Sequence, residues 1–208
     1  SSNMDYYRKQ VEASMTPYIL EERNMNVTQM DIFSRLMADR ILWVAGPVND
    51  NMSTVVQAQL MFLDNVADSD ITLHIDSPGG SVKSGLSMVD VMEYINSDIR
   101  TINTGMAASM GAVLLCAGAA GKRTALKHSR VMIHQPLGGA QGQATDIEIT
   151  AREIQKLKKE LYDIIANHSG QTYEKVWADS DRDYWMTSTE AKEYGMIDEV
   201  LFKNTTKK

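Results

Sequence analysis

A single hydroxyl side chain, that of Ser109, lies inside the apolar stretch from Met106 to Gly121. The residues before it are typical of a strand and those after it of a helix. Ser109 is therefore expected at a helix N-terminus, where free backbone N–H groups concentrate. A serine at such a position is commonly an N-cap. Alternatively, its hydroxyl is a nucleophile, with space for a substrate beside small neighbours such as Ala108 and Gly111.

A serine nucleophile needs a base, and the sequence offers four histidines. His168 ends a long helical pattern and His128 lies in a turn. His74 alternates with apolar residues of a strand, so its side chain is expected to face away from the core. His134 closes an apolar strand, and strand ends open onto clefts. His134 is therefore the best candidate of the four.

The imidazole of such a base is oriented by a carboxylate. Local sequence does not identify this carboxylate, and six aspartates remain candidates: Asp76, Asp146, Asp179, Asp181, Asp183 and Asp198.

A glycine-containing turn offers backbone N–H groups as a second candidate feature for catalysis. The stretch "DSPGGS" follows a strand and holds Gly79 and Gly80, where the chain can turn without a Cβ. Such a sequence is often only a turn. Its exposed N–H groups can also bind an oxyanion, with the N–H of Gly80 acting together with that of Met110 beside the Ser109 hydroxyl.

Composition limits the class of protein. The chain has 208 residues, of which 43% are hydrophobic and 23% charged, as in one sizeable globular domain. A net charge of -6 without a basic block argues against a nucleic-acid partner. Cys116 alone forms no internal disulfide and is interpreted as a small buried hydrophobe. The stretch from Met106 to Gly121 is too short and weakly apolar for a membrane span, and the polar N-terminus lacks a signal-peptide pattern.

Strand and helix patterns alternate along the chain, which predicts one α/β domain. We expect helices over 30–40, from an N-cap at Ser53 or Thr54, over 84–97 and over 109–117. We expect strands over 40–46, 70–76, 99–105 and 129–136.

A long helix follows the Gly- and Gln-rich stretch. Thr145 and Glu148 fit a capping box and Gly170 fits the C-terminal stop, giving roughly five turns or about 30 Å. One apolar stripe runs along it: Ile147, Ile154, Leu157, Leu161, Ile164 and Ile165. The stripe could pack on the chain's own core or pair with a partner subunit.

Five blocks from about Tyr18 to Phe202, in this order, resemble the Clp protease (ClpP) family of serine peptidases. They are "FSRLMADRI", "IDSPGGSV", "TGMAASMGAVLLCAGAAGKR", "SRVMIHQPLGGAQGQATDIEITAREI" and "DRDYWMTSTEAKEYGMIDEV". The resemblance implies an α/β, ClpP/crotonase-like fold of repeated β-β-α units. It also implies a single peptidase domain over 18–208, with a protruding handle helix over about 137–170. Residues 1–17 would be an N-terminal tail, a propeptide or an axial-loop region.

The resemblance also assigns the site. Ser109 matches the nucleophile, His134 the general base and Asp183 the orienting acid, while Gly80 and Met110 match the oxyanion-hole donors. The triad is complete, which counts against an inactive paralogue. The implied activity is that of a serine endopeptidase without a metal or organic cofactor.

The resemblance further implies a homo-oligomer of two stacked heptameric rings, a tetradecamer located in the cytoplasm. Asp181 and Arg182 match a pair that links ring contact to triad alignment, and Gln141 lies in the inter-ring segment. An AAA+ unfoldase would dock on the ring and deliver unfolded proteins. It would also use the ATP, because this chain lacks the G-x-x-x-x-G-K-[ST] motif.

The docking residues implied for the unfoldase are Tyr94, Ile102, Leu126 and Leu201. Thr72 and His74 are a departure, because they stand where the family often has aromatic residues. No nucleic-acid or membrane partner is implied.

Three alternatives share parts of this pattern. A crotonase-type acyl-CoA enzyme also uses paired backbone donors but does not need the whole triad. A signal-peptide peptidase has a similar "IDSPGG" but would use a Ser–Lys dyad and a membrane anchor. A structural ring subunit would carry the triad without using it.

Overall fold

The computed structural model describes residues 18–23, 26–136 and 144–203. The N-terminal segment 1–17 and Gln141 lie outside these residues. Within them, no helix is both long and apolar enough to cross a membrane.

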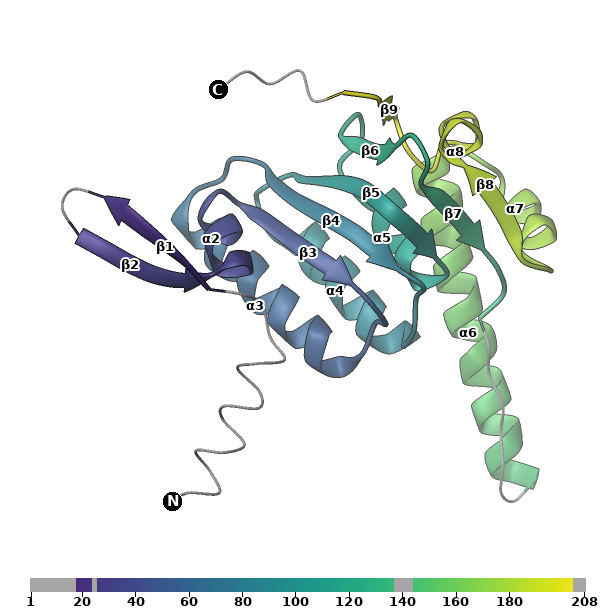
Figure 1. The fold of residues 1–208 in the computed structure, drawn as a ribbon. Coiled ribbons are helices and arrows are strands. Elements are labelled where there is room, and N and C mark those ends of the chain that lie inside the picture. Colours follow the sequence, from purple (N-terminus) through teal and green to yellow (C-terminus); the bar gives the residue numbers. More distant parts are fainter. Residues whose placement is uncertain (1–17, 24–25, 137–143, 204–208) are drawn as a thin grey trace.

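One mainly parallel sheet forms the centre of the molecule (Figure 1). Parallel neighbours follow each other in the order β3 (Ile41–Ala45), β4 (Ile71–Ser77), β5 (Ile99–Ala108), β6 (Arg123–Leu126) and β9 (Glu199–Leu201). The far end of β5 pairs with β7 (Arg130–Ile133), which pairs in turn with antiparallel β8 (Tyr184–Thr187). A separate antiparallel hairpin is made by β1 (Tyr18–Arg23) and β2 (Asn26–Asp31).

The helices of the described chain are α2 (Ile32–Ala38), α3 (Asp50–Val66), α4 (Val82–Tyr94), α5 (Met110–Cys116), α6 (Ala144–Ser169), α7 (Tyr173–Asp179) and α8 (Ser188–Tyr194). Figure 1 shows α3, α4 and α5 on one face of the sheet, while α6 passes beside α5 and projects beyond it. The alternation of strands with helices confirms the predicted α/β class.

The core lies between the sheet and these helices. Ile71, Leu73 and Ile75 of β4 are fully buried, as their alternation predicts. Every residue of α5 is buried, so this helix is packed on all sides. The residue that precedes α5 is therefore held by a rigid, completely enclosed element.

One predicted helix start and one predicted helix length are wrong. Helix α3 is capped by Asn49, whose side chain accepts the N–H of Met52, whereas Ser53 is buried and donates to the carbonyl of Ser84. Helix α6 has 26 residues, or about 39 Å at 1.5 Å per residue, and is longer than the predicted five turns. The side chains of the predicted capping box, Thr145 and Glu148, lie outside the described part.

Candidate active site

The backbone of Ser109 is strained. Its φ of 57° and ψ of -120° lie outside the regions that L-residues favour, and among the described non-glycine residues only Arg40 also has a positive φ. Such strain costs about 1–3 kcal/mol and persists where the surroundings impose it. Here the N–H of Ser109 donates to the carbonyl of Met132 on β7, while the next residue already belongs to buried α5.

Ser109 occupies the N-cap position of α5, but its side chain makes no capping hydrogen bond. The plain N-cap interpretation therefore does not account for the hydroxyl. A serine on a sharp, strained strand-to-helix turn presents its Oγ outward, as a nucleophile must.

The glycine turn packs directly against Ser109. A Cβ on Gly79 would lie 2.7 Å from the Cβ of Ser109 and 3.1 Å from the backbone N of Met110. At Gly80 a Cβ would overlap the carbonyl oxygen of Val48. Both glycines also have positive φ values. The N–H of Met110 begins α5 and has no acceptor within the helix. The N–H of Met110 is thus next to Gly79, which directly precedes Gly80 in the chain.

His134 and Asp183 face each other across strand ends. In the β7–β8 register Ile133 is opposite Tyr184, so the residues one step beyond, His134 and Asp183, are also opposite. The Nδ1 atom of His134 lies 3.3 Å from Oδ1 of Asp183. The imidazole is 17% exposed and the carboxylate 64%.

Among the other candidate aspartates, Asp181 is exposed on the loop after α7, and three have different partners. Asp76 accepts the N–H of Met106, Asp179 binds Lys175 and Tyr194, and Asp198 binds Arg123. Asp146 has no described side chain. Geometry therefore favours Asp183 as the orienting carboxylate.

A small cavity brings Ser109 and His134 together. Its volume is about 20 Å³, close to the space that one water molecule needs. Its walls come from α4, α5, β7 and α6: Val82, Ser109, Met110, Val113, Ile133, His134, Pro136, Leu161, Tyr162 and Ile165. Apart from Ser109, His134 and the hydroxyl of Tyr162, this lining is apolar.

The loop after α7 lies close to the strand end that carries His134. Asp181 and Arg182 are exposed on this loop. The N–H of Gln135 donates to the carbonyl of Ser180 at 2.7 Å, and its amide nitrogen lies 3.3 Å from the carbonyl of Asp181. Hydrogen bonds thus link the segment that carries His134 to the loop that carries Asp181 and Arg182, the pair expected from the sequence to act in ring assembly.

The four predicted docking residues are partly or fully exposed. Tyr94 is 78% exposed at the end of α4 and Leu126 is 39% exposed on β6. Ile102 and Leu201 are half-buried, and Leu201 pairs with Leu126 in the β6–β9 register.

His74 shows a contact that the sequence did not reveal. It alternates with the buried residues of β4 as predicted, but Trp43 of β3 covers it, with ring centroids 4.2 Å apart. Burial lowers the pKa of His74. Neither Nδ1 of His74 nor Nε1 of Trp43 has a hydrogen-bond partner among the described residues. This pair depends on the β3–β4 register, which local patterns do not give.

A serine placed beside a histidine–aspartate pair, on a strained turn next to free backbone donors, defines the class of serine hydrolases.

The Clp protease family model matches residues 23–204. Two relatives, from Bacteroides fragilis and Bacteroides thetaiotaomicron, are each 68% identical over 190 residues. The aligned residues cover 91% of this chain, 92% of the Bacteroides fragilis relative and 86% of the Bacteroides thetaiotaomicron relative. A relative from Porphyromonas gingivalis is 57% identical over 202 residues, covering 97% of this chain and 91% of its own. All three are named ATP-dependent Clp protease proteolytic subunit. The chain therefore belongs to the Clp protease family of serine peptidases.

Proposed function

We propose that this chain is the proteolytic subunit of an ATP-dependent Clp protease and cleaves peptide bonds of unfolded proteins. The observation that carries the proposal is the His134–Asp183 pair beside the cavity that contains the uncapped hydroxyl of Ser109.

The catalytic cycle assigns one role to each group. With Nδ1–H of His134 donated to Asp183, Nε2 is free to take the proton from the Ser109 hydroxyl. The Ser109 oxygen then attacks the carbonyl carbon of the substrate. The proton on Nε2 passes to the leaving amine, and water hydrolyses the acyl-enzyme by the same steps. Asp183 holds the imidazole tautomer and stabilises the imidazolium.

The backbone N–H groups of Gly80 and Met110 bind the oxyanion of the tetrahedral intermediate. One such donor is worth about 3–4 kcal/mol in the transition state. Because side chains and backbone fill every role, the proposal includes no metal or organic cofactor. A separate AAA+ unfoldase supplies the ATP-driven step.

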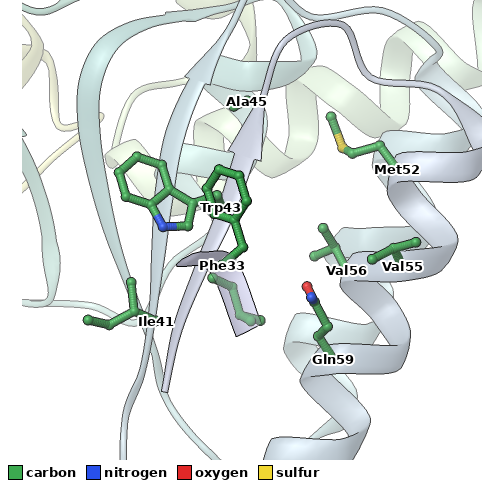
Figure 2. Close-up of a pocket in the computed structure, with 9 residues that line it drawn as sticks. Phe33, Ile41, Trp43, Ala45, Met52, Val55, Val56 and Gln59 are labelled. Carbon is green, nitrogen blue, oxygen red and sulfur yellow. The ribbon is translucent and has the colours of Figure 1, made fainter. Parts of the chain in front are cut away.

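Assembly is part of the proposal, with two heptameric rings in the cytoplasm. One apolar groove supports it: Phe33, Trp43, Met52 and Val55 line a cavity of about 300 Å³ between β3 and α3 (Figure 2). Further along α3, Phe62 and Val66 are 58% and 65% exposed. Strand β3 is also terminal among the described strands of the sheet. A second copy of the chain covering this face would remove that apolar surface from water.

The three alternatives fit less well. A crotonase-type enzyme gives no reason for a histidine–aspartate pair beside Ser109. A Ser–Lys dyad needs a lysine near the serine, and none lines the cavity among the described residues. A structural ring subunit gives no reason for a strained, uncapped serine.

The first test is hydrolysis of a short fluorogenic peptide by the wild type and Ser109→Ala, with particle mass measured by light scattering. We expect both proteins to assemble and only the wild type to cleave. A fluorophosphonate probe should label the wild type at Ser109. Equal cleavage by both proteins would contradict the assignment of Ser109, and an assembled wild type that is neither labelled nor active would favour a structural subunit.

A further inference from the structure

The pairing of β7 with β8 ends one residue before the histidine–aspartate pair. The last paired residues are Ile133 and Tyr184, so His134 and Asp183 lie just beyond the paired positions. Their contact of 3.3 Å is longer than the distance of about 2.7–2.9 Å in a tight charge-assisted hydrogen bond. The carboxylate of Asp183 is also 64% exposed. Neither strand pairing nor burial fixes this contact, so neighbouring residues have to align it.

Gln135, directly after His134, connects the two segments that carry the pair. Its backbone N–H donates to the carbonyl of Ser180 at 2.7 Å. Its side-chain Nε2 lies 3.3 Å from the carbonyl oxygen of Asp181, two residues before Asp183. The side chain of Gln135 is therefore a second link between the segments. It is exposed, however, and a free amide can rotate away from its acceptor.

Lys158 of α6 sets the direction of the Gln135 amide. Its Nζ lies 3.5 Å from Oε1 of Gln135. An ammonium only donates hydrogen bonds and a backbone carbonyl only accepts them. The amide oxygen therefore faces Lys158 and the amide nitrogen faces the carbonyl of Asp181. Without the ammonium on its oxygen side, the amide is free to turn its nitrogen away from Asp181.

The ammonium of Lys158 is itself held by α7, the helix that leads to the loop of Asp181. It lies 3.8 Å from the centroid of the Trp177 ring and 5.7 Å from that of Tyr162. Trp177 meets Tyr162 edge-on with centroids 5.7 Å apart, and α6 packs against α7. A tryptophan face attracts a cation more strongly than other aromatic rings do. Lys158 is half-buried and therefore has a defined position, although its side chain is long.

The contacts of Lys158 and Gln135 contribute little to folding. Distances of 3.5 Å and 3.3 Å are long for hydrogen bonds, and water can replace either partner at an exposed side chain. Their direction matters more, because a misplacement of about 1 Å at a reacting group can lower a rate by about 10². A change at Lys158 should therefore affect catalysis more than stability.

We propose that Lys158 is a positioning residue of the active site: acting through Gln135, it keeps the imidazole of His134 aligned with its carboxylate. This inference rests on the proposed peptidase function.

The test is Lys158→Met, which keeps a long unbranched side chain and removes the ammonium. Hydrolysis of the fluorogenic peptide by the assembled protein should show kcat lowered by about tenfold, with KM within about twofold of the wild type. The rate at which a fluorophosphonate labels Ser109 should fall by a similar factor, while the particle mass and the urea midpoint stay unchanged. Lys158→Arg keeps the charge, the donors and the stacking on Trp177, so its kcat should stay within about threefold of the wild type.

Lys156→Met is the matched control, since it makes the same change at an exposed residue of the same helix. Its kcat should equal that of the wild type. Gln135→Leu removes the other end of the contact and should lower kcat by about tenfold as well. Because the two residues act in one network, the double variant should lose at most about twofold more than either single variant.

Three results would overturn the inference: an unchanged kcat in Lys158→Met, a kcat as low in Lys158→Arg as in Lys158→Met, or losses that multiply in the double variant. If Lys158→Met does not assemble, Gln135→Leu decides, and an unchanged kcat in that variant would overturn the inference. A wild type that neither cleaves the peptide nor reacts with the fluorophosphonate would instead contradict the proposed function.

Discussion

Oδ1 of Asp183 lies 3.3 Å from Nδ1 of His134, although 49 residues separate the two in sequence. The antiparallel pairing of β7 with β8 makes the contact, since Ile133 is opposite Tyr184 at the last paired position. The site therefore depends on sheet register as much as on the identity of its residues.

Asp183→Asn tests this pairing. The amide keeps the shape of the carboxylate but can donate to Nδ1, which favours the wrong imidazole tautomer and no longer stabilises the imidazolium. In a working triad this lowers kcat by about 10³–10⁴. Peptide hydrolysis at saturating substrate measures the loss, with Asp90→Asn, an exposed residue of α4, as the control. A loss below about tenfold would show that Asp183 does not orient the base.

Gly79→Ala tests the contact between the glycine turn and Ser109, the proposed nucleophile. The new Cβ would lie 2.7 Å from that of Ser109, and Gly79 has a φ of 94°. We expect kcat to fall at least about tenfold and the free energy of unfolding to fall by about 1–3 kcal/mol.

Gly121→Ala is the matched control for backbone strain alone. Gly121 has a φ of 84°, but a Cβ added there would meet no atom within 4 Å beyond its chain neighbours. This variant should lose about 1 kcal/mol of stability and keep its activity. Equal loss of kcat in both variants would rule out a specific role for the space at Gly79.

Several features of the fold and the site follow from local sequence. The alternation of Ile71, Leu73 and Ile75 predicts a strand with one buried face, and a strand-to-helix boundary predicts the place of Ser109. His134 follows from its position at a strand end. Each of these inferences uses only residues close to one another in the chain.

Other features depend on register and packing, which local patterns do not contain. Local sequence leaves six aspartates equally acceptable, and only β8 places Asp183 opposite His134. The stack of Trp43 on His74 needs the β3–β4 register. Local sequence also does not indicate that Tyr162 lines the cavity beside Ser109. Tyr162 interrupts the aliphatic stripe of its helix, and it comes close to Ser109 only when α6 packs beside α5.

Asp198→Asn tests a buried ion pair that joins three segments. Arg123 binds both carboxylate oxygens of Asp198 and donates to the carbonyls of Cys116 and His168 at the ends of α5 and α6. The variant leaves a 7% exposed guanidinium without its counter-charge. We expect the free energy of unfolding at pH 7 to fall by about 3 kcal/mol.

The same pair predicts a pH dependence. The hydrogen bond from Arg123 lowers the pKa of Asp198 below 3.8, so its stabilisation is present above that value and is lost as the pH falls through the lower, folded-state pKa. Urea unfolding between pH 7 and 3 should therefore show the gap between wild type and Asp198→Asn narrowing only at the acid end. A gap that is constant with pH would assign the loss to packing rather than charge.

Arg40→Lys tests a guanidinium that closes the end of α3. Arg40 donates to the carbonyls of Leu63, Ala67, Ser69 and Asp70 and to the hydroxyl of Ser97, at distances of 2.7–3.2 Å. A lysine keeps the charge but has three donors on one nitrogen and cannot reach acceptors spread around a planar fork. Chemical unfolding should show that the free energy of unfolding falls by about 2–3 kcal/mol, because carbonyls around Arg40 lose a charged donor.

The control is Arg100→Lys, at an exposed residue whose contact with Asp70 is 3.5 Å. It should lower the free energy of unfolding by less than about 0.5 kcal/mol. Equal effects of the two substitutions would mean that charge alone, and not the geometry of the fork, stabilises this corner of the fold.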